Sequence, residues 1–234
     1  MQKRTELPAA VIFDMDGVLV NSNPHHLAKW VNFLDRHKIS YKEEELPELI
    51  LGKRNDTAFR HFMGPDLAQE EANRLSQEIE EDFRKVFKPH AKPLPGLDAL
   101  IKECHAAGIP MAVASSAVRK NIEFVVDALG YRPYFRTMVS GDEVTHPKPD
   151  PEIYLKAADH LGINPADAVA FEDSYVGIGA VMNAGMKCVA IASTFPIEKI
   201  RPLSDLAVPS FEYINLGRLR ELFVAEDTSS SVAR

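Results

Sequence analysis

Five short, nearly unbroken apolar runs are spaced along the chain. They are AAVIF at 9–13, IPMAVA at 109–114, YFRTMV at 134–139, DAVAF at 167–171 and KCVAIA at 187–192. Runs of this length without polar alternation are typical of β-strands buried on both faces. Such strands indicate a parallel sheet that is covered by helices on both sides.

Helical segments with recognisable ends lie between these runs. They are PGLDALIKECHAAG at 95–108, SAVRKNIEFVVDALG at 116–130 and DPEIYLKAADHLG at 150–162. Each ends in glycine, which favours helix termination, and the last opens with Asp150-Pro151, a favourable helix start. Strands that alternate with helices predict the α/β class, with a doubly wound parallel sheet as the core.

Residues 23–90 interrupt this alternation, because they contain no convincing apolar strand and are richer in charge than the chain average of 26%. Two apolar stripes with helical spacing run through them. The stripes are Leu27, Trp30, Val31 and Leu34, then Leu75, Ile79, Phe83 and Val86. We expect residues 23–90 to form an all-helical domain with hinges near NSNP and HAKPLPG, and residues 1–22 and 91–234 to form the α/β domain. The polar tail at 226–234 is expected to be frayed.

Composition and charge narrow the class of protein. The chain has 234 residues, 45% of them apolar, and a net charge of −7, so neither nucleic acid nor an anionic membrane is an expected partner. The N-terminus lacks a signal-peptide apolar stretch, and no run reaches the roughly 18 residues of a membrane helix, which predicts a cytoplasmic protein. Cys104 and Cys188 lack metal-site spacing and are expected to be reduced thiols. A monomer or weak dimer is expected.

Polar residues gather where the predicted strands end. The first strand is followed by Asp14 and Asp16, the second by Ser115 and Ser116, and the fourth by Glu172 and Asp173, while the loop THPKPDPE carries Lys148. Ligands of doubly wound sheets bind outside the carboxyl ends of the strands, so these side chains are expected to face one crevice.

These residue types suit phosphoryl transfer. A phosphate dianion cannot approach several carboxylates unaided, and oxygen ligands at strand ends suit Mg²⁺. Lys148 and Ser115 would bind phosphoryl oxygens, one aspartate would act as nucleophile, and the second would act as acid and base. The pKa of that second carboxyl would have to rise from about 3.9 to work near neutral pH.

Each signal alone has a structural explanation. A D-x-D after a strand is often turn chemistry, a single lysine such as Lys148 is usually a solvated surface residue, and Ser115 or Ser116 could cap a helix. The sequence GIGAVM at 177–182 has methionine where a dinucleotide fingerprint needs glycine, which favours helix packing instead. The joint placement of the polar groups at successive strand ends favours a catalytic site.

Four segments together resemble the motifs of the haloacid dehalogenase superfamily. They are FDMDGVLV at 13–20, AVASSA at 112–117, KPDPEIY at 148–154 and AFEDSYVGIGAVMNAG at 170–185. The match spans the whole α/β region in order, and residues 23–90 resemble the helical cap that this superfamily inserts after its first motif. The branch that the chain most resembles is β-phosphoglucomutase with its related sugar-phosphate phosphatases.

The resemblance implies a role for each matched residue. Asp14 would be the nucleophile and Asp16 the acid/base, an aspartate that the metal-free dehalogenases lack. Mg²⁺ would be held by Asp14, the backbone carbonyl of Asp16, Asp173 and, directly or through water, Glu172. Ser115 and Lys148 would bind the transferring phosphoryl group. The substrate would be a small phosphorylated metabolite, and the expected substrate-binding residues are Gly17, Ser116, His26, Arg54 and Asn55.

The resemblance leaves mutase and phosphatase as alternatives. His26 and Trp30 match the mutase, in which the cap histidine handles substrate. Asn55, however, stands where the mutase has a phosphate-binding arginine, with Arg54 adjacent, and Ile79 stands where it has a sugar-contacting lysine. A mutase must hold two phosphoryl groups, so a phosphatase is favoured. A phospho-acceptor receiver module is a third alternative, disfavoured by the long insertion.

Overall fold

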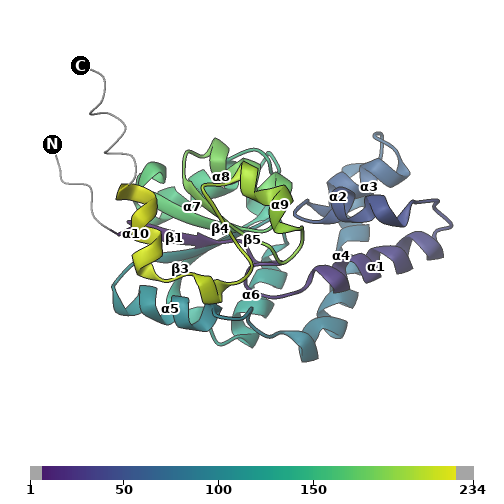
Figure 1. Ribbon diagram of the computed structural model, residues 1–234. Coiled ribbons are helices and arrows are strands. Elements are labelled where there is room, and N and C mark those ends of the chain that lie inside the picture. The colour runs from purple at the N-terminus through teal and green to yellow at the C-terminus, as the bar shows by residue number, and fades with distance from the viewer. Residues whose placement is uncertain (1–6, 225–234) are drawn as a thin grey trace, which may run out of the picture.

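The computed structural model describes residues 7–224 and contains one six-stranded, fully parallel sheet (Figure 1). The strands are β1 (Ala10–Phe13), β2 (Met111–Ser115), β3 (Phe135–Ser140), β4 (Ala168–Glu172), β5 (Lys187–Ile191) and β6 (Leu206–Val208). The five predicted strands and the α/β class are confirmed. Strand β6 was not predicted, because a run of three residues gives too short a pattern to recognise.

The strand order β3-β2-β1-β4-β5-β6 places β1 at the centre, where the chain direction across the sheet reverses. Phe13 is in register with Val113 on one side and with Phe171 on the other. The carboxyl ends of β1, β2 and β4 therefore meet at one edge. This switch point is where a doubly wound sheet opens a crevice for a ligand.

Helices cover both faces of the sheet, as the unbroken apolar strands predicted. Val11 and Phe13 face the cluster formed by α5 (Leu97–Ala106), α6 (Arg119–Ala128) and α10 (Leu216–Val224). Ala10 and Ile12 face the cluster formed by α7 (Glu152–Leu161), α8 (Tyr175–Asn183) and α9 (Ile197–Ile200). Strand β3 departs from the prediction: it lies at the sheet edge and is only partly buried, so residues 134–139 do not form a strand enclosed on both faces.

Residues 23–90, here called the cap, contain α1 (Asn23–Arg36), α2 (Leu46–Ile50), α3 (Asn55–Met63) and α4 (Gln69–Phe87), which group at one end of the molecule (Figure 1). They enclose a separate apolar cluster in which the Trp30 and Phe59 rings lie 4.7 Å apart. The second predicted stripe is wrong at its end, because Val86 is 60% exposed and Phe87 is buried in its place. Phe83 and Phe87 join the cluster of the α/β region, so α4 packs on both regions and the boundary near residue 90 stays a prediction.

Two smaller expectations concern membranes and cysteines. Within residues 7–224, no helix has the length and apolarity needed to cross a bilayer. Cys104 and Cys188 are both buried free thiols. The tail at 226–234 lies outside the described residues.

Candidate active site

A buried lysine and two buried carboxylates form the centre of the crevice. Lys148 Nζ lies 2.8 Å from Asp14 Oδ1 and 2.6 Å from Glu172 Oε1, and all three residues are at most 5% exposed. The simple surface explanation for Lys148 is therefore wrong. Burial lowers the pKa of Lys148, but Asp14 and Glu172 outweigh this effect and raise it above its ordinary value, so the ammonium is charged.

Glu172 has partners on both carboxylate oxygens. Oε1 accepts hydrogen bonds from Lys148 and, at 2.7 Å, from the hydroxyl of Tyr154. Oε2 accepts from the backbone N–H of Asp173 and from the backbone and side chain of Ser174. This set of donors fixes the carboxylate and favours the water-mediated form of the two metal contacts expected for Glu172.

Carboxylate oxygens of Asp14, Glu172 and Asp173 come within 4.8 Å of one another, so the described residues offer a set of ligand atoms for a metal ion. Burial, together with Glu172 and Asp16, raises the pKa of Asp14 to about 8 against the lowering effect of Lys148. Burial and the neighbouring carboxylates also raise the pKa of Asp173 well above its usual range. A divalent cation would relieve this repulsion, and an all-oxygen ligand set fits Mg²⁺.

Asp173 is oriented by two residues that were not predicted, Asn23 and Thr194. Its Oδ2 accepts hydrogen bonds from Asn23 Nδ2, at 2.9 Å, and from the Thr194 hydroxyl. Gly17 lies directly against it, since a Cβ there would stand 1.9 Å from Asp173 Oδ2, and its φ of 76° also requires glycine. Gly17 thus supports the carboxylate cluster, and its contact with substrate stays a prediction.

Asp16 lies beside the cluster with its side chain turned toward the cap. Its Oδ1 is 3.0 Å from His26 Nε2 and accepts a hydrogen bond from Ser22. Burial raises the pKa of this carboxyl, but His26 and Ser22, with Lys29 further away, lower it by more, so the net pKa is below the ordinary value. The rise in pKa expected from the sequence is absent, because His26 and Ser22 stabilise the ionised carboxylate.

The two serines at the end of β2, Ser115 as its last residue and Ser116 just after it, have different environments. Ser115 is 1% exposed, lines the crevice and accepts a hydrogen bond from the backbone N–H of Ala117. Ser116 Oγ donates to the carbonyl of Gly52, which belongs to the cap. Helix α6 begins only at Arg119, with Val118 as its N-cap, so neither serine caps it.

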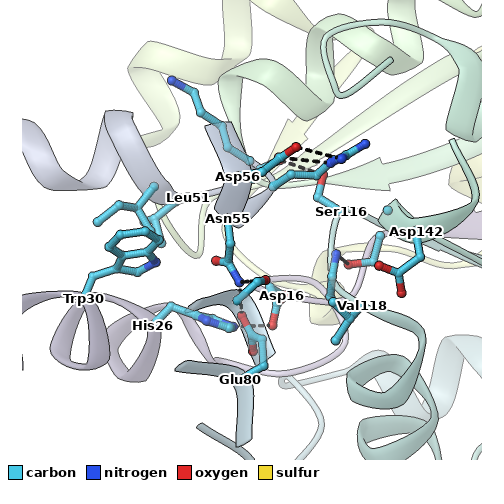
Figure 2. A pocket seen from close by; sticks show the side chains of 18 of the residues that line it. Asp16, His26, Trp30, Leu51, Asn55, Asp56, Glu80, Ser116, Val118 and Asp142 are labelled. Atoms are coloured by element: carbon cyan, nitrogen blue, oxygen red, sulfur yellow. Dashed lines mark hydrogen bonds and ion pairs between the residues drawn. The ribbon is translucent and has the colours of Figure 1, made fainter. Parts of the chain in front are cut away.

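The cap closes over the crevice and leaves a cleft of about 770 Å³, counting the part open to solvent. In Figure 2, His26, Asn55 and Glu80 converge from the cap on one side, while Ser116 and Asp142 lie on the opposite side. Trp30 and Leu51 add apolar surface. The cleft therefore joins the carboxylate cluster to a mainly polar cap wall.

Arg54 is not free in this wall. Its Nε and Nη2 bind both carboxylate oxygens of Asp56, at 3.1 and 2.8 Å, and its Nη1 donates to the carbonyl of Val144 across the cleft. The guanidinium is thus neutralised and links the cap to the α/β region. Its use as a substrate-binding group stays a prediction.

On α4, the residue that the resemblance assigned to the sugar-contacting position does not line the cleft. Ile79, assigned to the sugar-contacting position, is 1% exposed and belongs to the apolar cluster of the cap. The residues of α4 that line the cleft are Asn73, Ser76 and Glu80. Asn55 Nδ2 donates to Ser76 Oγ at 3.0 Å and to Glu80 Oε1 at 2.6 Å, so the amide that replaces an expected arginine is held in place.

Helix α8 confirms the packing explanation for GIGAVM. A Cβ at Gly177 would lie 1.9 Å from Glu172 Oε1, and a Cβ at Gly179 would lie 3.2 Å from Pro149. These glycines let α8 approach the carboxylate cluster closely. Three residues that were not predicted also hold this cluster: Tyr154, Asn23 and Thr194. The first two lie within or beside the four motifs, whereas Thr194 has no sequence signal.

Comparison with known proteins places the chain in a family. Residues 11–191 match the family described as "Haloacid dehalogenase-like hydrolase". The chain belongs to this family of enzymes, and the resemblance inferred from the four motifs is confirmed.

Individual relatives cover most of the chain. Fructose-1-phosphate phosphatase YqaB of Escherichia coli (strain K12) is 31% identical over 183 residues, or 78% of this chain and 96% of that protein. Hexitol phosphatase A of the same organism is 29% identical over 213 residues, or 88% of this chain and 93% of that protein. Among solved structures, β-phosphoglucomutase from Clostridium difficile superposes with a TM-score of 0.84 and 22% identity, covering 95% of this chain and 100% of that one, a likeness of fold.

Proposed function

We propose that this chain is a Mg²⁺-dependent phosphatase that hydrolyses a small phosphorylated metabolite, a sugar or polyol phosphate. The observation that carries the proposal is the buried cluster of Asp14, Lys148, Glu172 and Asp173 beneath a cleft with a polar cap wall. Relatives named as fructose-1-phosphate and hexitol phosphatases support the substrate class.

Asp14, Asp173 and the backbone carbonyl of Asp16 would hold the metal ion, with Glu172 acting through water. The ion would supply charge neutralisation, which lets a phosphate dianion enter a buried acidic site. Lys148, already 2.8 Å from Asp14, would bind a non-bridging phosphoryl oxygen, and Ser115 would donate a hydrogen bond to another.

The reaction would take two displacements at phosphorus. Asp14 Oδ attacks the phosphorus and the bond to the ester oxygen breaks. The leaving alcohol takes a proton from Asp16, whose carboxyl must therefore be protonated in the substrate complex, although its pKa is lowered in the free protein. Asp16 then accepts a proton from water, whose oxygen attacks the phosphorus of phospho-Asp14 and restores the Asp14 carboxylate as inorganic phosphate leaves. His26, 3.0 Å from Asp16, orients its carboxyl between the two steps.

The charges of the cap wall favour a phosphatase over a mutase. Of the described residues lining the cleft, Arg54 and Lys53 carry permanent positive charge, and Arg54 is paired with Asp56. Glu80 on the same side is paired with Lys29 in turn. A second phosphate group on the substrate would meet one unpaired lysine among neutralised pairs, a weak site for the second phosphoryl group that a mutase must hold.

The test is incubation of the purified protein and Mg²⁺ with a panel of hexose, hexitol and triose phosphates and β-glucose 1-phosphate plus a trace of its bisphosphate. Inorganic phosphate and glucose 6-phosphate are measured in parallel, with Asp14→Asn as the blank. We expect phosphate release from one ester class and a fall of about 10⁴-fold or more in the blank.

Other outcomes select the alternatives. Glucose 6-phosphate formed without phosphate release would identify a β-phosphoglucomutase. Stoichiometric labelling by acetyl phosphate without turnover would identify a receiver-like acceptor. Substantial hydrolysis by Asp14→Asn would refute the aspartyl-phosphate route.

A further inference from the structure

A single asparagine of the α/β region is held at both ends of its amide by the cap. Asn121 on α6 is 0% exposed. Its Nδ2 donates to Glu80 Oε2 at 2.5 Å, and its Oδ1 accepts from Arg84 Nη1 at 2.6 Å. Glu80 and Arg84 stand one turn apart on α4, so they grip the amide from the same helix face.

Packing alone gives no reason for an amide at this position. The other buried residues of α6 are apolar: Ile122, Val125 and Val126. A buried amide without partners costs about 1–3 kcal/mol, so while α4 covers Asn121, the register in which both cap residues contact the amide avoids this cost. The amide therefore favours one arrangement of the cap against α6.

Glu80 connects this contact to the cleft. Its Oε1 accepts hydrogen bonds from Lys29 and Asn55, both at 2.6 Å, while its Oε2 accepts from Asn121. Although burial raises the pKa of Glu80, Lys29, His26 and Asn55 lower it below its ordinary value, so the carboxyl is ionised. One carboxylate thus joins the cleft wall to the α/β region.

We propose that Asn121 is a positioning residue: through Glu80 and Arg84 it holds the cap closed in the register that aims Asn55 at the distal part of the substrate. The Asn55 amide nitrogen is used by Ser76 and Glu80, which leaves its carbonyl oxygen as the acceptor for a substrate hydroxyl. The expected change in KM rests on the proposed function, whereas the expected position of the cap does not.

The test uses a swap of the two interacting groups. Asn121→Asp sets a carboxylate against Glu80 and breaks the contact by repulsion. Adding Glu80→Gln restores it in reverse, because an amide on α4 then donates to a carboxylate on α6, whose second oxygen still accepts from Arg84. Glu80→Gln alone, and Asn32→Asp on the exposed side of α1, are the controls. Arg84→Gln weakens the same contact without placing a charge in the core, in case Asn121→Asp does not fold.

The first measurement is independent of activity. Spin labels at Ala28→Cys on α1 and Ala128→Cys on α6 report the cap position, since both sites are exposed and the native cysteines are buried. We expect one narrow distance distribution for the unmodified protein, a broad one for Asn121→Asp and a narrow one again for the swap. A broad distribution in the unmodified protein, or no change in Asn121→Asp and Arg84→Gln, would overturn the proposal.

The second measurement is the KM of each variant. For a hexitol phosphate we expect the KM of Asn121→Asp to rise about tenfold, because one buried charge-assisted hydrogen bond is lost. The KM should recover in the swap. For acetyl phosphate, which is too small to contact the cap wall, KM should be unchanged. Equal KM effects on both substrates would refute the positioning role. If no ester is hydrolysed even by the unmodified protein, the proposed function fails, while the distances still decide the role of Asn121.

Discussion

The two sides of the cleft are built in different ways. On the α/β side, carboxylates at the ends of parallel strands and a lysine from the loop before α7 are almost fully buried and depend on one another for charge balance. On the cap side, polar groups come from three helices and neutralise one another in local pairs, Arg54 with Asp56 and Lys29 with Glu80. The first arrangement suits one reaction on a phosphoryl group, and the second suits selection among the alcohols attached to it.

The largest expected difference in stability lies in the strand-end cluster. Lys148→Met removes the cation between Asp14 and Glu172, and breaking a buried ion pair in this way lowers the free energy of unfolding by about 3–5 kcal/mol. Urea unfolding in the presence of EDTA measures the loss. Lys120→Met, at an exposed position of α6, is the matched control, and equal stability of the two variants would show that the cluster is not charge-balanced by the lysine.

The next effect concerns the cap alone. Ile79→Ala opens a cavity in the apolar cluster of the cap and should lower its free energy of unfolding by about 2–4 kcal/mol. Trp30, the only tryptophan of the chain, lies in that cluster and reports its unfolding by fluorescence. Val86→Ala on the same helix is 60% exposed and should have almost no effect. A loss in Val86→Ala as large as that in Ile79→Ala would support the predicted stripe, which contains both residues, against the observed exposure of Val86.

A metal ion should stabilise one side of the cleft. Mg²⁺ at 100 times its dissociation constant should raise the free energy of unfolding by about 2.7 kcal/mol relative to EDTA, because it binds only the folded carboxylate cluster. Thermal unfolding with and without Mg²⁺ measures the shift. Asp173→Asn should abolish the shift, whereas Asp159→Asn, at an exposed position of α7, should leave it unchanged. A shift that survives in Asp173→Asn would place the ion elsewhere.

The smallest expected effect is the reaction of the two cysteines with a thiol reagent in the native protein. Burial, with a smaller contribution from Glu103, raises the pKa of Cys104 to about 12, and burial also raises the pKa of Cys188 well above its usual range. Almost no thiolate then exists at pH 8, so a thiol reagent should react only after urea unfolds the protein. Rapid labelling of the native protein would indicate local opening of the α/β region.

Pattern and spacing predicted most of the α/β region. Five strands lie where the apolar runs predicted them, because a strand buried between helices must be apolar throughout. The cluster around Asp14, Ser115, Lys148 and Glu172 also followed from the chain alone, since parallel strands bring their carboxyl ends to one edge. The shortest strand was missed, and β3 was assigned two buried faces that an edge strand does not have.

The cap was predicted only as a set of helices. Helical periodicity shows which side of a helix is apolar, but it does not say which other helix faces the polar side. The one-residue difference between Ile79 and Glu80 therefore went unnoticed, although it separates a core residue from a residue of the cleft.

The sequence by itself determined the fold class, the family and the strand-end carboxylates, because these depend on local patterns and on a sheet topology that brings them together. Only the tertiary structure decided the state of each charge. The lowered pKa of Asp16, the pairing of Arg54 with Asp56 and the contact of Glu80 with Asn121 arise from partners that are brought close by packing. Electrostatic energy depends on distance and burial, and neither can be read from separation along the chain.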